Sequence, residues 1–181
     1  MIRVNAPSYV KMDQAHIMLI YGTALAVKPL AILELGIGSG AVTTALLNAI
    51  MYNNCGTLTV VDNWLDWNGV RPEIVGLAHT SKINIIDGDE ENVVRAWAPG
   101  TVDLIVSDAD HTNAHKWFET TMRLLTKNGV AFFHDVTNPM FPNLGTLELQ
   151  AKQYGYGHCL FNKSSLDHEK CERGLLMVMQ K

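Results

Sequence analysis

The sequence lacks several features that would assign it at once to a familiar class. Its three cysteines are widely spaced and form no CxxC pair, so neither a disulfide framework nor a zinc ribbon is indicated. Basic residues are in deficit, with 14 Lys and Arg against 18 Asp and Glu, so no nucleic-acid partner is expected. The most apolar run, from Ile17, stops at Lys28, short of the roughly 20 residues of a membrane span. With no apolar signal region at the start, we expect one cytoplasmic domain over residues 1–181, with no membrane partner.

Short apolar runs alternate with amphipathic ones, which predicts an α/β fold. Five runs rich in Val, Ile and Leu are typical of buried parallel strands: 31–35, 58–61, 83–86, 103–107 and 130–133. Helices are expected at 13–27, 41–51, 72–79, 90–97 and 112–126, the last ended by the capping sequence Lys127-Asn128-Gly129. Two more strands, 157–162 and 174–180, are joined by a loop too short for a parallel crossover. We therefore predict a doubly wound, mostly parallel Rossmann-like sheet of about seven strands with an antiparallel C-terminal hairpin.

The first predicted strand runs into a glycine-rich turn, Gly36-Ile37-Gly38-Ser39-Gly40. Glycine tolerates positive φ and has no Cβ, so a ligand can lie against the main chain, near the N–H groups of the next helix. A tight turn that only packs helix on strand explains the glycines equally well. The turn also satisfies the dinucleotide pattern GxGxx(G/A), with Ala41 in the last place. It therefore indicates a nucleotide site without deciding which nucleotide.

Acidic residues dominate the other strand ends, where ligands bind in this class of sheet. The ends carry Glu34, Asp62, Asp87-Gly88-Asp89, Asp108-Ala109-Asp110 and His134-Asp135. No Lys or Arg is expected at a strand end, since the nearest, Lys116, falls inside the following helix. A pyrophosphate would meet like charge there, whereas a sulfonium and an ammonium would be attracted. The charge pattern thus favours S-adenosyl-L-methionine over NAD(P), with an NAD(P)-dependent oxidoreductase and a non-catalytic S-adenosylmethionine-binding domain as alternatives.

These stretches together resemble the class I S-adenosylmethionine-dependent methyltransferases along nearly the whole chain. ELGIGSG, VVDN and IIDGDEENV resemble the first three motifs of that family, and VDLIVSDADH and LLTKNGVAFFHDV resemble small-molecule O-methyltransferases of the catechol and sugar-modifying groups. The resemblance implies that Glu34 lies near the cofactor's amino group, Asp62 on the ribose hydroxyls and Asp89 near the adenine amine. It implies further cofactor contacts from Gly36, Gly38, Ser39, Gly40, Asn63, Gly88 and Asp108.

A hydroxyl acceptor needs a general base or a metal ion, and two arrangements stay open. In the first, which the resemblance implies, Asp108, His134 and Asp135 bind Mg²⁺, although His134-Asp135 replaces the family's usual Asp-Asn pair. In the second there is no metal, and His111 or His134 is the base. The candidate catalytic residues are therefore Asp108, His111 and His134. His111 and His115 are four residues apart and would share one face of a helix. There they could bind a metal ion together, or they could simply be two exposed side chains.

The acceptor is expected to be a small molecule. No Asp/Asn-Pro-Pro-Tyr/Phe sequence follows the fourth strand, which argues against methylation of nucleobase amino groups. The chain has no room for a separate substrate domain. A cap over the substrate must come from the amino-terminal segment, the loop after Asp135 or a partner subunit, so a homodimer is one arrangement left open.

Overall fold

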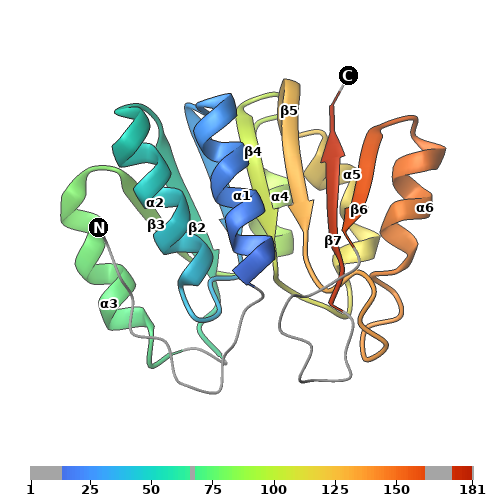
Figure 1. Cartoon of the computed structure of the whole chain (residues 1–181). Coiled ribbons are helices and arrows are strands. Elements are labelled where there is room, and N and C mark those ends of the chain that lie inside the picture. Colours follow the sequence, from blue (N-terminus) through green and yellow to red (C-terminus); the bar gives the residue numbers. More distant parts are fainter. Residues whose placement is uncertain (1–13, 66–67, 162–172, 181) are drawn as a thin grey trace.

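The computed structural model describes residues 14–65, 68–161 and 173–180 (Figure 1). One seven-stranded sheet runs through the molecule in the order β3-β2-β1-β4-β5-β7-β6. The strands are β1 Ala31–Leu35, β2 Thr57–Asp62, β3 Ile83–Asp87, β4 Val102–Ser107, β5 Leu125–Phe133, β6 Gly157–Phe161 and β7 Leu175–Met179. The first five are parallel, and β7 is antiparallel to both β5 and β6. The predicted fold class, including the C-terminal hairpin, is confirmed.

Helices cover both faces of the sheet. They are α1 Gln14–Val27, α2 Ala41–Asn53, α3 Arg71–Gly76, α4 Glu90–Ala96, α5 Phe118–Met122 and α6 Thr146–Gln153, with the 3-10 turns η1 Leu77–Thr80 and η2 Ala114–Lys116. One apolar core joins the sheet to α1 and α2 through Ile20 and Leu46. A second core joins the sheet to α4, α5 and α6 through Val94, Phe118 and Leu147. In Figure 1, α1 and α2 lie in front of the sheet and α4 and α5 behind it. None of the helices described is long and apolar enough to cross a membrane.

The prediction of one long helix over residues 112–126 is wrong. That segment forms the turn η2 and the short helix α5, and β5 already begins at Leu125. Leu125 pairs with Val102 and Val130 pairs with Leu104, so the residues between them bulge out of the strand. Asn128 in this bulge has a φ of 68°. Residues 127–129 therefore belong to a bulge in β5 and are not the cap of a helix.

Two other segments differ from the prediction. The helix expected at 72–79 is divided into α3 and η1. Helix α6 was not predicted, because within it only Leu147 and Ala151 are buried and the apolar pattern is too short to detect. Most residues of the loop predicted between the last two strands lie outside those described. The same is true of the amino-terminal segment.

Candidate active site

The glycine turn follows β1, at the point where the strand order of the sheet reverses and a crevice opens. Gly36 has a φ of 78°, and a Cβ atom there would lie 2.5 Å from the main-chain oxygen of Asp108 at the end of β4. Glycine is therefore required at this position for strand packing, whether or not a ligand binds. Gly38 and Gly40 also have positive φ angles.

Two cavities lie beside this turn, and both include Gly36, Gly38, Asp108 and His111 in their walls. We call the smaller one, of about 140 Å³, the small lobe. Its walls are Glu34, Gly36, Ile37, Gly38, Ser39, Val42, Val106, Asp108, His111, His134, Asp135 and Arg173. The large lobe, of about 530 Å³, is lined by Gly36, Gly38, Asp62, Asn63, Asp89, Glu90, Asp108, Ala109, Asp110, His111, Thr112, Asn113 and Phe141. Of the predicted cofactor residues, Gly40 and Gly88 line neither lobe.

Glu34, on β1, is the most deeply buried acid of the small lobe. Glu34 is only 1% exposed, and neither carboxylate oxygen makes a hydrogen bond of normal geometry with the residues described, although Thr43 lies close enough to act as a weak donor. Burial raises the pKa of Glu34 to about 8; Thr43 opposes this shift, and the charges of Asp108 and Asp62 add to it. A buried carboxylate without a partner is unfavourable. The position therefore suits a ligand that brings a hydrogen-bond donor, and a cation above all.

Asp62, at the end of β2, holds the glycine turn in place. Its Oδ2 accepts a hydrogen bond from the main-chain N–H of Ile37 at 2.7 Å, and its Oδ1 accepts one from Trp64 at 2.6 Å. Sequence reasoning missed this structural role. Because each carboxylate oxygen has two acceptor sites, the predicted contact with ribose hydroxyls is compatible with it and stays a prediction.

Acidic side chains gather in the large lobe, as the strand ends indicated. They are Asp62, Asp89, Glu90, Asp108 and Asp110, and no Lys or Arg is among the described residues that line it. Asp89 also caps α4, accepting a hydrogen bond from the N–H of Asn92 at 2.9 Å. Glu90 was not predicted, because acids in the first turn of a helix are usually exposed. Here it is buried, and that burial raises the pKa of Glu90 to about 7.

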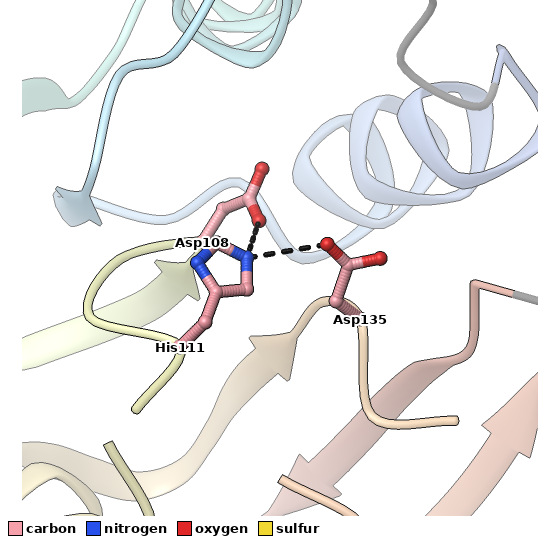
Figure 2. Close-up of side chains that lie close together, drawn as sticks. All are labelled: Asp108, His111 and Asp135. Atoms are coloured by element: carbon pink, nitrogen blue, oxygen red, sulfur yellow. Dashed lines mark ion pairs between the residues drawn. The ribbon is translucent and has the colours of Figure 1, made fainter. Parts of the chain in front are cut away.

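The side chains of Asp108, His111 and Asp135 lie close together (Figure 2), and Asp108 and His111 line both lobes. His111 Nε2 lies 3.3 Å from Asp108 Oδ1 and 3.2 Å from Asp135 Oδ2. One possible ligand atom from each residue lies within 4.8 Å of the other two, which is close enough to surround one metal ion. The ring of His111 packs on Phe141, from the loop after β5, at 4.4 Å between centroids. His115 is not part of this group, since the helix that would have aligned the two histidines does not form.

His134, at the end of β5, approaches Asp108 from the protein interior. Its Nδ1 lies 3.1 Å from Asp108 Oδ1 and 3.8 Å from Asp135 Oδ2. Its ring stands edge-on to that of His16, a buried residue of α1 that sequence reasoning missed, at 5.3 Å between centroids. The predicted set Asp108, His134 and Asp135 is thus brought together. His111 is nevertheless closer to Asp135 than His134 is, and it is the more exposed of the two histidines.

These four side chains shift one another's pKa values. Burial alone would raise the pKa of Asp108, but His134 and His111 hold it well below its usual range. Burial would lower the pKa of His111, but hydrogen bonds with Asp108 and Asp135 outweigh it and raise the pKa to about 10. The pKa of His134 is also raised, since the charge of Asp108 exceeds the effect of burial. Without a metal ion, the imidazole of His111 is therefore positively charged at neutral pH.

Two arginines reach the strand ends, where the sequence prediction expected no basic residue. Arg71, from α3, forms an ion pair with Asp87 at the end of β3. Arg173, just before β7, lines the small lobe, with its Nε 3.9 Å from Asp135 Oδ1. The prediction was wrong because both arginines arrive from segments that are distant in sequence from the strand ends they meet.

Comparison with known proteins identifies the family of this chain. A family model described as a methyltransferase domain matches residues 33–136. The chain belongs to this methyltransferase family. The match runs from just before Glu34 to just after Asp135, so it contains every predicted site residue, whereas His16 and Arg173 lie outside it.

Solved structures support the methyltransferase fold. The Podospora anserina methyltransferase PaMTH1, bound to S-adenosylhomocysteine (SAH), is 17% identical, with a TM-score of 0.74 over 94% of this chain and 80% of that one. An O-methyltransferase from Bacillus cereus, in complex with SAH, is 17% identical, with a TM-score of 0.74 over 98% and 85%. The Streptomyces achromogenes O-methyltransferase TomG, in complex with S-adenosylmethionine (SAM), is 13% identical, with a TM-score of 0.72 over 96% and 83%. No curated protein matches the chain.

Proposed function

We propose that this methyltransferase domain transfers the methyl group of SAM to a hydroxyl oxygen of a small molecule. Glu34 provides the observation that carries the proposal. Its buried carboxylate makes no hydrogen bond of normal geometry with the described residues and lines the small lobe beside the glycine turn. The ammonium group of SAM supplies the missing cation. The solved neighbours bound to SAM or SAH, and those named O-methyltransferases, agree with this assignment.

The large lobe supports SAM over a nicotinamide cofactor. Five carboxyl groups line it, and no Lys or Arg is among its described lining residues. A dinucleotide would place its pyrophosphate against these acids, and the repulsion grows where water is excluded. The nucleoside of SAM carries no phosphate, so it avoids this cost. Asp62, Asp89 and Asn63 are the lining residues proposed to bind the ribose and the adenine.

A divalent metal ion is proposed at Asp108, His111 and Asp135. The geometry fits, because one ligand atom from each residue lies within 4.8 Å of the other two. The donor set of two carboxylates and one imidazole suits Mn²⁺ or another transition ion at least as well as Mg²⁺, which prefers oxygen ligands. When bound, such an ion would lower the pKa of a coordinated hydroxyl group. The predicted Mg²⁺ set with His134 remains the alternative.

The pKa values favour this arrangement over a metal-free one. Since the pKa of His111 is raised to about 10, this imidazole is already protonated at neutral pH and cannot act as the base. The pKa of His134 is also raised, which makes it a less available proton acceptor. His111 can give up its proton when a cation takes its place between the two carboxylates. His134 is then left to hold Asp108 in position through its Nδ1, 3.1 Å from Oδ1.

The remaining parts of the proposal follow from the site's surroundings. Phe141, from the loop after Asp135, lines the large lobe and packs on His111, so this loop is the described part of a cover over the acceptor. The acceptor is proposed to be a small molecule. A cytoplasmic location and a homodimer are kept as predictions.

The cofactor is tested by thermal melting with SAM, SAH, NAD and NADP. A ligand at 100 times its Kd adds about 2.7 kcal/mol, which is several degrees for a domain of this size. We expect SAM and SAH to raise the Tm and the nicotinamide cofactors to leave it unchanged. A rise with NAD alone would reject the proposal. Turnover against a panel of phenols and sugars then separates an enzyme from a domain that only binds SAM.

The metal is tested by direct binding. Calorimetry with Mn²⁺ and Mg²⁺ on the wild type, His111→Ala and His134→Ala identifies the third ligand, and His115→Ala is the matched control. We expect His111→Ala to lose Mn²⁺ binding and His115→Ala to retain it. Loss in His134→Ala alone would restore the set predicted from sequence. Full turnover in the presence of a chelator would remove the metal from the mechanism.

A further inference from the structure

The small lobe contains an acidic and a basic side chain that are not paired with each other. On one side Glu34 is buried, and its oxygens make no hydrogen bond of normal geometry with the residues described, with Thr43 as a weak donor at most. On another side stands Arg173, whose only polar contact within the described part of the chain is the ion pair with Asp135. A ligand with an ammonium and a carboxylate on the same carbon would satisfy both.

We propose that Arg173 binds the carboxylate of the cofactor's amino-acid end, while Glu34 binds its ammonium. This inference rests on the proposed use of SAM. It adds a residue from the C-terminal hairpin, outside the matched family segment, to the cofactor site.

The sizes of the two lobes agree with this placement. The small lobe has about 140 Å³ against about 530 Å³ for the large lobe, roughly a quarter of the volume. SAM has the same asymmetry, with a short amino-acid end and a larger nucleoside. The apolar part of the small lobe, from Ile37, Val42 and Val106, suits the methylene groups between the sulfur and the charged end.

Arg173 has the donors that this contact needs. Its Nε lies 3.9 Å from Asp135 Oδ1, which is an ion pair but is longer than a hydrogen bond. The guanidinium has five N–H donors and can hold a carboxylate through two of them at once. The side chain is 37% exposed, so it can adjust to a ligand without leaving a buried position.

The competing explanation is that Arg173 binds an anionic group on the methyl acceptor. The two explanations differ in which ligand loses affinity when the guanidinium is removed. The experiment therefore compares SAH, which has the whole amino-acid end, with 5′-methylthioadenosine, which has the same nucleoside and lacks that end.

Binding of both compounds is measured by calorimetry for the wild type, Arg173→Gln and Arg173→Lys. Arg95→Gln is the matched control, because Arg95 pairs with Glu91 on the surface of α4 and lines neither lobe. Charge-assisted hydrogen bonds of this kind imply that Arg173→Gln binds SAH roughly 10- to 100-fold more weakly. Its affinity for 5′-methylthioadenosine should equal that of the wild type, and Arg173→Lys should lie between Arg173→Gln and wild type for SAH.

Two results would overturn the inference. Unchanged SAH affinity in Arg173→Gln, with or without a raised KM for the acceptor, removes Arg173 from the cofactor site. Equal weakening of both compounds shows that the substitution disturbs the site as a whole. Failure of the proposed function is distinguishable, because in that case the wild type itself does not bind SAH.

Discussion

Glu34→Gln should change how the stability of the ligand-free protein depends on pH. Glutamine keeps the shape of the side chain and cannot ionise. In the wild type, burial raises the pKa of Glu34 from 4.5 to about 8. Because its pKa is higher in the folded state, folding is favoured when Glu34 is protonated. This contribution is complete below about pH 4.5 and is lost as the pH rises through about 8.

The pKa difference sets the size of the effect. The difference between a pKa of 4.5 and one of about 8, at about 1.4 kcal/mol for each pH unit, corresponds to roughly 5 kcal/mol. This value is an upper limit, since water can enter the small lobe once Glu34 ionises. It is nevertheless a large part of the 5–15 kcal/mol, to order of magnitude, by which domains are stable. The free energy of unfolding of the wild type, minus that of Glu34→Gln, should therefore fall by up to about 1.4 kcal/mol per pH unit between these pKa values.

Equilibrium unfolding in urea gives this difference directly. Both proteins are measured across the range from about pH 5 to about pH 9, and the contributions of the other titrating groups largely cancel in the subtraction. Saturating SAH should flatten the dependence in the wild type, because an ammonium beside Glu34 stabilises its ionised form. A difference that is independent of pH in the ligand-free proteins would refute the reasoning, since Glu34 would then have an ordinary pKa.

Three further substitutions test other parts of the site and the fold. Gly36→Ala should abolish the SAH-dependent rise in Tm and lower the Tm itself, because its Cβ would clash with the main-chain oxygen of Asp108; a normal shift would contradict the turn geometry. Trp64→Phe loses the 2.8 Å hydrogen bond to Asp87 and should cost about 1 kcal/mol in urea unfolding, with SAH affinity retained; a large loss of affinity would place Trp64 in the cofactor site. Asp103→Ala removes three hydrogen bonds to its carboxylate and should cost roughly 1–3 kcal/mol at neutral pH without any effect on SAH binding; an unchanged free energy of unfolding would contradict it.

Much of the site could be predicted because parallel strands end at one edge of the sheet. Glu34, Asp62, Asp108 and Asp135 come from different strands, and the strands alone bring them together. Runs of Val, Ile and Leu mark such strands clearly, since both faces are buried. Gly36 was also recognisable, although the structure shows that it is needed for the approach of β4 as much as for a ligand.

The remaining residues of the site could not be predicted, because their positions depend on geometry that a periodic sequence pattern does not contain. Asp110 has a φ of 38°, and this local turn, rather than the predicted helix, directs His111 to Asp108 and Asp135. His16 and Arg173 come from a helix and a hairpin whose positions depend on packing against the whole sheet. No rule of spacing links them to the strand ends they meet.

The main chain and the side chain of Asp108 have different roles. Its main-chain oxygen packs against the glycine turn, whereas its carboxylate lies within 3.3 Å of both His111 and His134. Asp108→Asn keeps the main chain and the shape of the side chain, so we expect it to bind SAH nearly as the wild type does. It should lose affinity for Mn²⁺, since a neutral amide is a weaker ligand than a carboxylate and no longer balances the two histidines. Calorimetry with each ligand separates these effects, and an equal loss of both affinities would show that the carboxylate of Asp108 also belongs to the cofactor site.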